Sequence, residues 1–138
     1  MKIMNHCLFK LIVLCLFLVS PLFFNTGYAS EEDYKQLLSN QLAMTPETWK
    51  QLRSNGVDST TALTLDYFYY CTSRQAAEKC KQHLLKYDYT MQIRPEDPLD
   101  ESTLWLLKGN TQTTVVDEKI LLDWVEYMVT AGWNFGCY

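Results

Sequence analysis

The amino-acid sequence predicts an α+β domain of the ferredoxin-like type: a β-α-β-β-α-β order, an antiparallel sheet with two helices on one face, and an N-terminal helical arm before it. Three observations support this prediction. Residues 63–71 are dense in aromatic and β-prone side chains. Residues 73–86 and 117–132 carry apolar side chains at helical spacing, and two short strand-like runs lie between them.

Residues 1–29 have the pattern of a secretory signal peptide. Two lysines accompany an apolar run at 11–24, and Gly27 and Ala29 supply the small residues expected before a cleavage site. The run is shorter than the roughly 20 residues that cross a bilayer as a helix. We therefore expect cleavage before Ser30, a periplasmic or secreted location, and no membrane attachment afterwards; a retained membrane anchor is the alternative.

The mature chain is expected to divide into a helical arm at 30–56 and a sheet domain at 57–138. Residues 31–43 are mostly helix formers, so they predict a first helix. Thr45 followed by Pro46 has the pattern of a new helix start, with a hydroxyl cap and a proline where its missing N–H does no harm. The arm should therefore consist of two helices that dock on the sheet domain.

The sheet domain should begin with a buried strand at 63–71 and a helix that Thr72 or Ser73 caps and that ends near Lys86. The apolar face of this helix is expected to point into the core. The remaining elements are a strand at 87–94, a proline loop at 95–98, a strand at 103–108, a turn at Gly109–Asn110, a helix from Asp117 to Gly132 and a short strand at 133–138.

Composition disfavours one class of partner. Cleavage would remove Lys2 and Lys10, which lowers the number of basic residues from 12 to 10 against 16 acidic ones and the net charge from −4 to −6. The remaining basic residues are scattered, so a phosphate backbone would be repelled. We expect no nucleic-acid binding.

Three stretches in this order resemble the regulator of ribonuclease activity B family: Leu52-Arg53-Ser54-Asn55-Gly56-Val57-Asp58, Asp66-Tyr67-Phe68-Tyr69-Tyr70 and Ser73-Arg74-Gln75-Ala76-Ala77. Trp105, Gly132 and the final Gly136-Cys137-Tyr138 also fit, so the resemblance extends over about 49–138. It implies a ferredoxin-like fold and a protein that acts on a protein partner, because the family's named activity is to bind and inhibit ribonuclease E.

Two features depart from that family. Its members typically continue past the tyrosine into an Asp-Gly-Trp ending, whereas this chain stops at Tyr138. Ribonuclease E is a cytoplasmic enzyme, and an exported protein would not meet it. We therefore expect an unidentified protein partner in place of ribonuclease E.

Two surfaces are candidates for that partner. Alternation along the first strand puts Tyr67, Tyr69 and Cys71 toward the helices and Asp66, Phe68 and Tyr70 on the opposite face. The favoured interpretation is that the N-terminal helices cover this opposite face, and a partner or dimer surface is the alternative. The second candidate is an acidic loop with the acids Glu96, Asp97, Asp100 and Glu101. A solvated loop is the favoured interpretation, and a weak calcium site or a contact for a basic partner is the alternative.

Residues that would support catalysis are few. The mature chain has one histidine, His83, with no sign of the nucleophile and carboxylate that a catalytic triad needs. One histidine and three dispersed cysteines fit no zinc spacing. We expect a non-catalytic protein-binding domain with no metal or cofactor.

The cysteines leave alternatives open. Cys71, Cys80 and Cys137 survive cleavage, an odd number for an oxidising compartment. Buried thiols are the favoured interpretation, and a Cys71–Cys80 disulfide is the next, although a strand and a helix packed roughly 10 Å apart exceed the bridging limit of about 7 Å. The odd thiol also motivates the alternative function, a small cysteine-dependent enzyme or redox protein of the periplasm.

Overall fold

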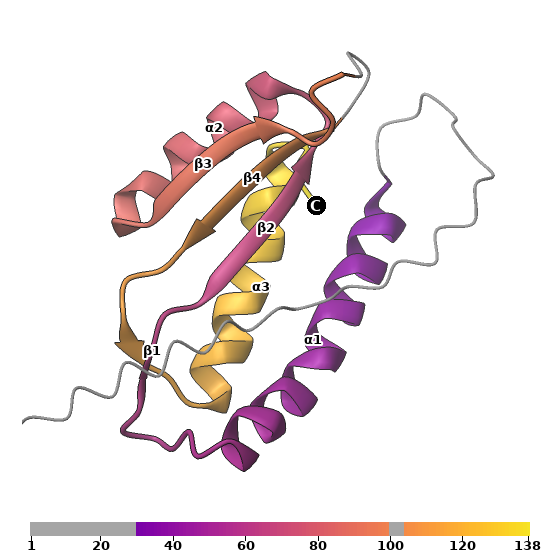
Figure 1. Ribbon diagram of the computed structural model, residues 1–138. Helices are drawn as coiled ribbons and strands as arrows, with labels where there is room; N and C mark the ends of the chain where they lie inside the picture. Colours follow the sequence, from indigo (N-terminus) through magenta and orange to yellow (C-terminus); the bar gives the residue numbers. More distant parts are fainter. Residues whose placement is uncertain (1–29, 100–103) are drawn as a thin grey trace, which may run out of the picture.

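The computed structural model describes residues 30–99 and 104–138, so the expected signal peptide at 1–29 lies outside the described residues. Figure 1 shows the order of the elements along the chain. They are α1 (Glu31–Ser54), β1 (Ala62–Leu63), β2 (Asp66–Cys71), α2 (Arg74–Leu84), the 3-10 helix η1 (Leu85–Tyr87), β3 (Thr90–Pro95), β4 (Trp105–Asn110), β5 (Thr114–Val115) and α3 (Glu118–Asn134). This mixture of helices and antiparallel strands confirms the predicted α+β class.

The main sheet has the strand order β2-β4-β3, and both pairs are antiparallel. The C-terminal segment adds a short pairing on the free side of β2, where the Tyr70 and Tyr138 backbones exchange N–H···O bonds of 2.8 and 3.0 Å. The predicted fourth strand is therefore shorter than 133–138, because α3 continues through Asn134 and the chain turns at Phe135 and Gly136. Strands β1 and β5 form a separate two-stranded pair.

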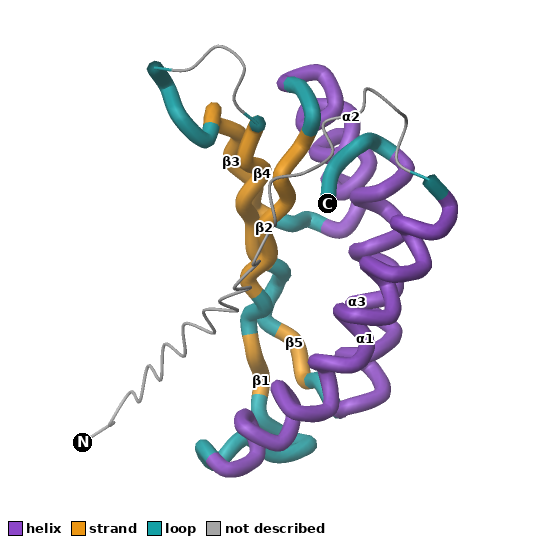
Figure 2. The backbone as a smooth tube through the Cα atoms, turned by 90° about the vertical axis from the view of Figure 1, so that its right-hand side faces the viewer, coloured by secondary structure: helices purple, strands orange, loops and turns teal. Residues whose placement is uncertain are grey.

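All three α-helices lie on one side of the main sheet (Figure 2). Between the sheet and the helices α2 and α3 is the main core, in which Ala77, Cys80, Leu84 and Leu107 are fully buried. The Tyr69 hydroxyl donates a 2.6 Å hydrogen bond to the backbone oxygen of Met128, which ties β2 to α3. Ser73 and Asp117 cap α2 and α3, as their sequence patterns predict.

The expected break in the N-terminal arm is wrong, because α1 is one continuous helix that contains Pro46. Proline removes one helical hydrogen bond, and the helix continues nevertheless. Both halves are held by contacts with the domain: Tyr34 shares a 2.9 Å hydrogen bond with Thr130 of α3, and Leu52 packs in a second core cluster with Leu121. This packing on both sides of the proline outweighs the local preference for a break.

The favoured interpretation that the arm covers the far face of the sheet is also wrong. Helix α1 packs along α3 in the antiparallel direction, and it therefore lies on the side of the main sheet that also carries α2 and α3 (Figures 1 and 2). Leu52 and Trp49 contact the start of α3, while Tyr34 contacts its end. No helix of the described residues covers the far face of the main sheet.

Two local predictions in the sheet also change. The strand expected at 63–71 divides into β1 and β2, because Thr64 and Leu65 carry the chain from the small sheet to the main one. Gly109 continues β4 and forms no turn. The Thr90 backbone and the ring of Tyr67 both lie against it, because a Cβ at this position would stand 2.4 Å from the Thr90 carbonyl oxygen and 2.5 Å from the Tyr67 hydroxyl oxygen. Gly109 is therefore explained by this close approach.

Candidate protein-binding surface

The outer face of the main sheet, which we define as the side away from the helices, is organised in three rows across the strands. The pairing register places one residue of β2, β4 and β3 in each row. The rows are Asp66–Asn110–Thr90, Phe68–Lys108–Gln92 and Tyr70–Leu106–Arg94.

Aromatic side chains of β2 are exposed on this face. Phe68 and Tyr70 are 44% and 41% exposed, whereas Tyr67 and Tyr69, which point to the helices, are 6% and 5% exposed. The orientation predicted from alternation is therefore present. Exposed rings of this size are a common feature of protein interfaces, where they supply much of the buried area.

Tyr138 extends the aromatic surface beyond the edge of β2. Its backbone is paired directly with that of Tyr70, and opposite residues of an antiparallel pair share a face. Tyr138 is 48% exposed. Sequence reasoning did not include this residue, because the register of the last segment depends on the disulfide described next.

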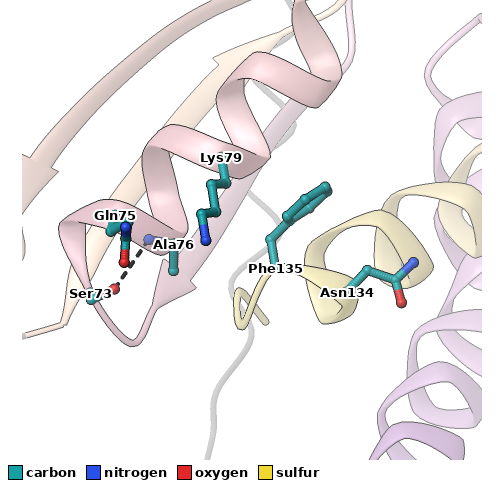
Figure 3. A pocket seen from close by; sticks show the side chains of 6 residues that line it. All are labelled: Ser73, Gln75, Ala76, Lys79, Asn134 and Phe135. Atoms are coloured by element: carbon teal, nitrogen blue, oxygen red, sulfur yellow. Dashed lines mark hydrogen bonds between the residues drawn. The ribbon is translucent and has the colours of Figure 1, made fainter.

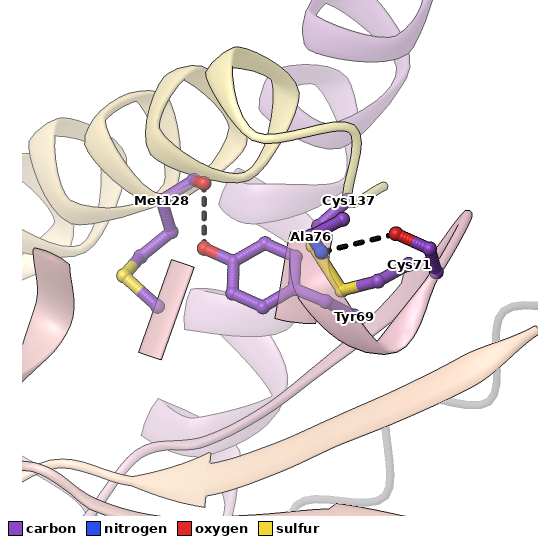
Figure 4. Close-up of a disulfide and its surroundings, with 6 residues drawn as sticks. Tyr69, Cys71, Ala76, Met128 and Cys137 are labelled. Carbon is purple, nitrogen blue, oxygen red and sulfur yellow. Dashed lines mark hydrogen bonds between the residues drawn. A yellow bond between two sulfur atoms is a disulfide. The ribbon is translucent and has the colours of Figure 1, made fainter. Parts of the chain in front are cut away.

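Cys71 and Cys137 form a disulfide between β2 and the C-terminal segment (Figure 4), with a Cα–Cα distance of 4.0 Å. The favoured interpretation of buried thiols is therefore wrong for Cys71 and Cys137 and holds for Cys80, and the considered Cys71–Cys80 bridge is also wrong. The two bonded cysteines lie opposite each other on neighbouring strands, whereas Cys80 is a free, fully buried thiol on α2. Burial raises the pKa of the Cys80 thiol to about 12, so it is neutral at physiological pH.

The acidic loop is only partly described. Glu96 and Asp97 are exposed at its start, and Asp100 and Glu101 lie outside the described residues. The Asp97 carboxylate accepts a 2.9 Å hydrogen bond from the backbone of Leu99. Within residues 30–99 and 104–138, no group of His, Cys, Asp and Glu side chains could hold a metal ion.

A hollow of about 340 Å³ lies between the start of α2 and the end of α3 (Figure 3). Its lining residues are Ser73, Gln75, Ala76, Lys79, Asn134 and Phe135. The Ser73 hydroxyl accepts a 3.1 Å hydrogen bond from the backbone of Ala76, which is its capping role. His83 is engaged elsewhere, with Nε2 2.9 Å from the Tyr127 hydroxyl. The described residues therefore show no nucleophile held beside a base.

The fold and surface define a small α+β domain that presents an open sheet face. The comparisons with known families identify it further. The family model for regulator of ribonuclease activity B (RraB) matches residues 42–138, most of the chain, and the chain belongs to this family. No curated protein gives a significant match. The family match begins inside α1, so the first turns of that helix lie outside it. None of the helices in the described part of the chain is long and apolar enough to cross a membrane.

Proposed function

We propose that this RraB-family chain is an exported, non-catalytic domain that binds a protein through the outer face of its sheet, and that it regulates this protein and not ribonuclease E. The observation that carries the proposal is the exposure of Phe68 and Tyr70 on a sheet face that none of the described helices covers. The family description names a regulator, and regulation by a small domain of this kind requires a contact surface on a partner.

Export is supported by two independent features. The first 29 residues have the pattern of a signal peptide, with a charged start, an apolar run and small residues before Ser30. The Cys71–Cys137 disulfide is typical of proteins that work in oxidising compartments. Both features favour a periplasmic or secreted location, where a cytoplasmic ribonuclease is absent.

The cysteine-dependent alternative is less well supported. A reactive cysteine is partly exposed and has a lowered pKa. Cys80 is fully buried and the pKa of its thiol is raised by burial, while Cys71 and Cys137 are bonded to each other. These properties favour a structural role for all three sulfur atoms.

Affinity capture from periplasmic extract tests the surface. The variant F68A/Y70A should retain little of what the wild-type chain captures, because both exposed rings are removed. A matched control is L85A/Y87A, which truncates two exposed side chains of η1 away from the sheet face. Equal capture by wild type and F68A/Y70A would show that the outer face is not the interface. Intact-mass measurement of the exported protein tests the location, and a mass that includes residues 1–29 would contradict cleavage.

A further inference from the structure

The outer face carries two cations that form no ion pair with any other described residue. Lys108 of β4 is exposed, with its Nζ 5.3 Å from the centroid of the Phe68 ring, and Arg94 of β3 is exposed in the next row. The ion pairs in the described part of the chain involve other residues. Two unpaired cations on one face of a chain with a net charge of −4 are a local reversal of its overall charge.

These cations lie among the apolar side chains of the face. We call the set Phe68, Tyr70, Arg94, Lys108 and Tyr138 the cationic half of the outer face. Leu106, which lies between Tyr70 and Arg94 in the third row, is only 7% exposed and adds little to this surface. Within the three rows the one side-chain carboxylate is that of Asp66, which lies in the polar row with Asn110 and Thr90. The exposed Glu96 follows two residues after Arg94, beyond the last row. The cationic half thus offers aromatic contact area and positive charge together, with the carboxylates of Asp66 and Glu96 at its two ends.

The spacing of the two cations fits an extended ligand. Lys108 and Arg94 are diagonal neighbours on adjacent strands, so their Cβ atoms are separated by roughly 7–8 Å. Carboxylates at alternate positions of an extended peptide are spaced by about 7 Å. An acidic extended segment can therefore present one carboxylate to each cation, while an apolar side chain from its flank contacts the rings of Phe68 and Tyr70.

We infer that the cationic half binds an acidic, extended segment of a partner protein. This inference rests on the proposed function, because it uses the same face, and it adds the chemistry of the partner. A nucleic-acid strand is disfavoured as the occupant, because it would bring a phosphate at every nucleotide to a chain of net charge −4 that offers two cations on this face. The exposed rings of Phe68 and Tyr70 could stack on bases, so a nucleic acid is included among the probes below.

Titration with defined probes tests the inference. The probes are a short synthetic peptide with Glu at alternate positions around a single Phe, its counterpart with Lys in place of Glu, and an oligouridylate. Binding is followed by amide chemical-shift changes and by calorimetry at two salt concentrations. The Glu peptide should bind, shift the amides of Phe68, Tyr70 and Lys108, and bind more weakly at higher salt.

Charge variants identify the contact. R94Q/K108Q should weaken binding of the Glu peptide about fivefold or more, because both charge contacts are lost at a partly exposed surface. The control K50Q/K119Q makes the same change in net charge on α1 and α3, and it should bind within about twofold of wild type. All four side chains are exposed, so no loss of folding is expected, and circular dichroism verifies this.

Several outcomes would overturn the inference. Equal or tighter binding of the Lys peptide, equal weakening by both charge variants, or no binding of the Glu peptide would each do so. The affinity capture described above separates this inference from the proposed function. If one of these results is found but F68A/Y70A captures less protein than the wild type, the proposed function stands and only the partner chemistry is wrong. Preferential binding of the oligouridylate would overturn both.

Discussion

Reduction of the Cys71–Cys137 disulfide should lower the free energy of unfolding by about 4 kcal/mol. The two cysteines are 66 residues apart in the sequence, so the bond closes a long loop in the unfolded chain. The loop-entropy relation gives about 14–15 cal/mol/K for such a loop, or about 4 kcal/mol at 25 °C. The native pairing of Tyr70 with Tyr138 remains possible after reduction, so the reduced chain should still fold.

Urea unfolding of residues 30–138 in the oxidised and reduced states measures this difference. With a slope of about 1.5 kcal/mol/M, the midpoint should fall by about 2–3 M on reduction. Thiol counting after denaturation should give one thiol in the oxidised chain, Cys80, and three in the reduced chain. The variant C71A/C137A should resemble the reduced chain, and reductant should no longer change its midpoint.

Two results would refute this reasoning. Three free thiols in the chain purified under oxidising conditions would mean that the bond does not form. A change in unfolding free energy below about 1 kcal/mol, with the bond verified, would mean that the loop-entropy account does not hold for this chain.

Three further predictions concern the core. The Tyr67 hydroxyl is buried without a hydrogen-bond partner among the described residues, so Y67F should stabilise the domain by about 1 kcal/mol. Y69F should destabilise the domain by about 1 kcal/mol, because it removes the hydrogen bond to the Met128 backbone oxygen. Urea midpoints of the two variants that shift in the same direction would contradict this pair of predictions. G109A should cost about 1–3 kcal/mol or more, since its Cβ would stand against the Thr90 carbonyl oxygen and the Tyr67 ring. An unchanged midpoint would show that both the β3 backbone and the ring can move away. Burial raises the pKa of the Cys80 thiol from 9.0 to about 12, so the contribution of the neutral thiol to stability is complete below pH 9 and is lost as the pH rises from 9 toward 12. The variant C80A should therefore lose less stability than the wild type over that pH range. Labelling of Cys80 in the native chain at neutral pH would contradict its burial.

The parts of the fold that follow from local sequence were predictable. Ser73 and Asp117 bring their own capping oxygens, and the alternation of Phe68 and Tyr70 with Tyr67 needs only the period of a strand. These features depend on residues within a few positions of each other. They were therefore visible without knowledge of the rest of the chain.

The errors all involve distant contacts. Pro46 signals a helix break, but packing of α1 along α3 keeps the helix continuous. Gly109 followed by Asn110 is typical of a turn, but in the folded domain the absence of a side chain at Gly109 leaves room for the ring of Tyr67. The uncovered outer face follows from the docking side of α1, which no local pattern specifies.

The candidate surface shows the same division. Phe68 and Tyr70 could be found from one strand, whereas the addition of Lys108 and Arg94 required the register of three strands. The partner of Cys137 required the position of the last segment beside β2. Such registers are set by the folded sheet as a whole.

The position of the disulfide also determines how the domain would respond to mechanical tension. The bond joins β2, in the main sheet, to the C-terminal segment, so a pull applied at residues 30 and 138 passes from Cys71 directly to Cys137. The residues between them, which include α2, β3, β4 and α3, would carry no load. With the disulfide intact, the chain from residue 30 to residue 138 could be extended to about 15 nm, whereas without the bond it could be extended to about 37 nm, at roughly 3.4 Å per residue. Most of the sheet would therefore be shielded from stretching while α1 is drawn away.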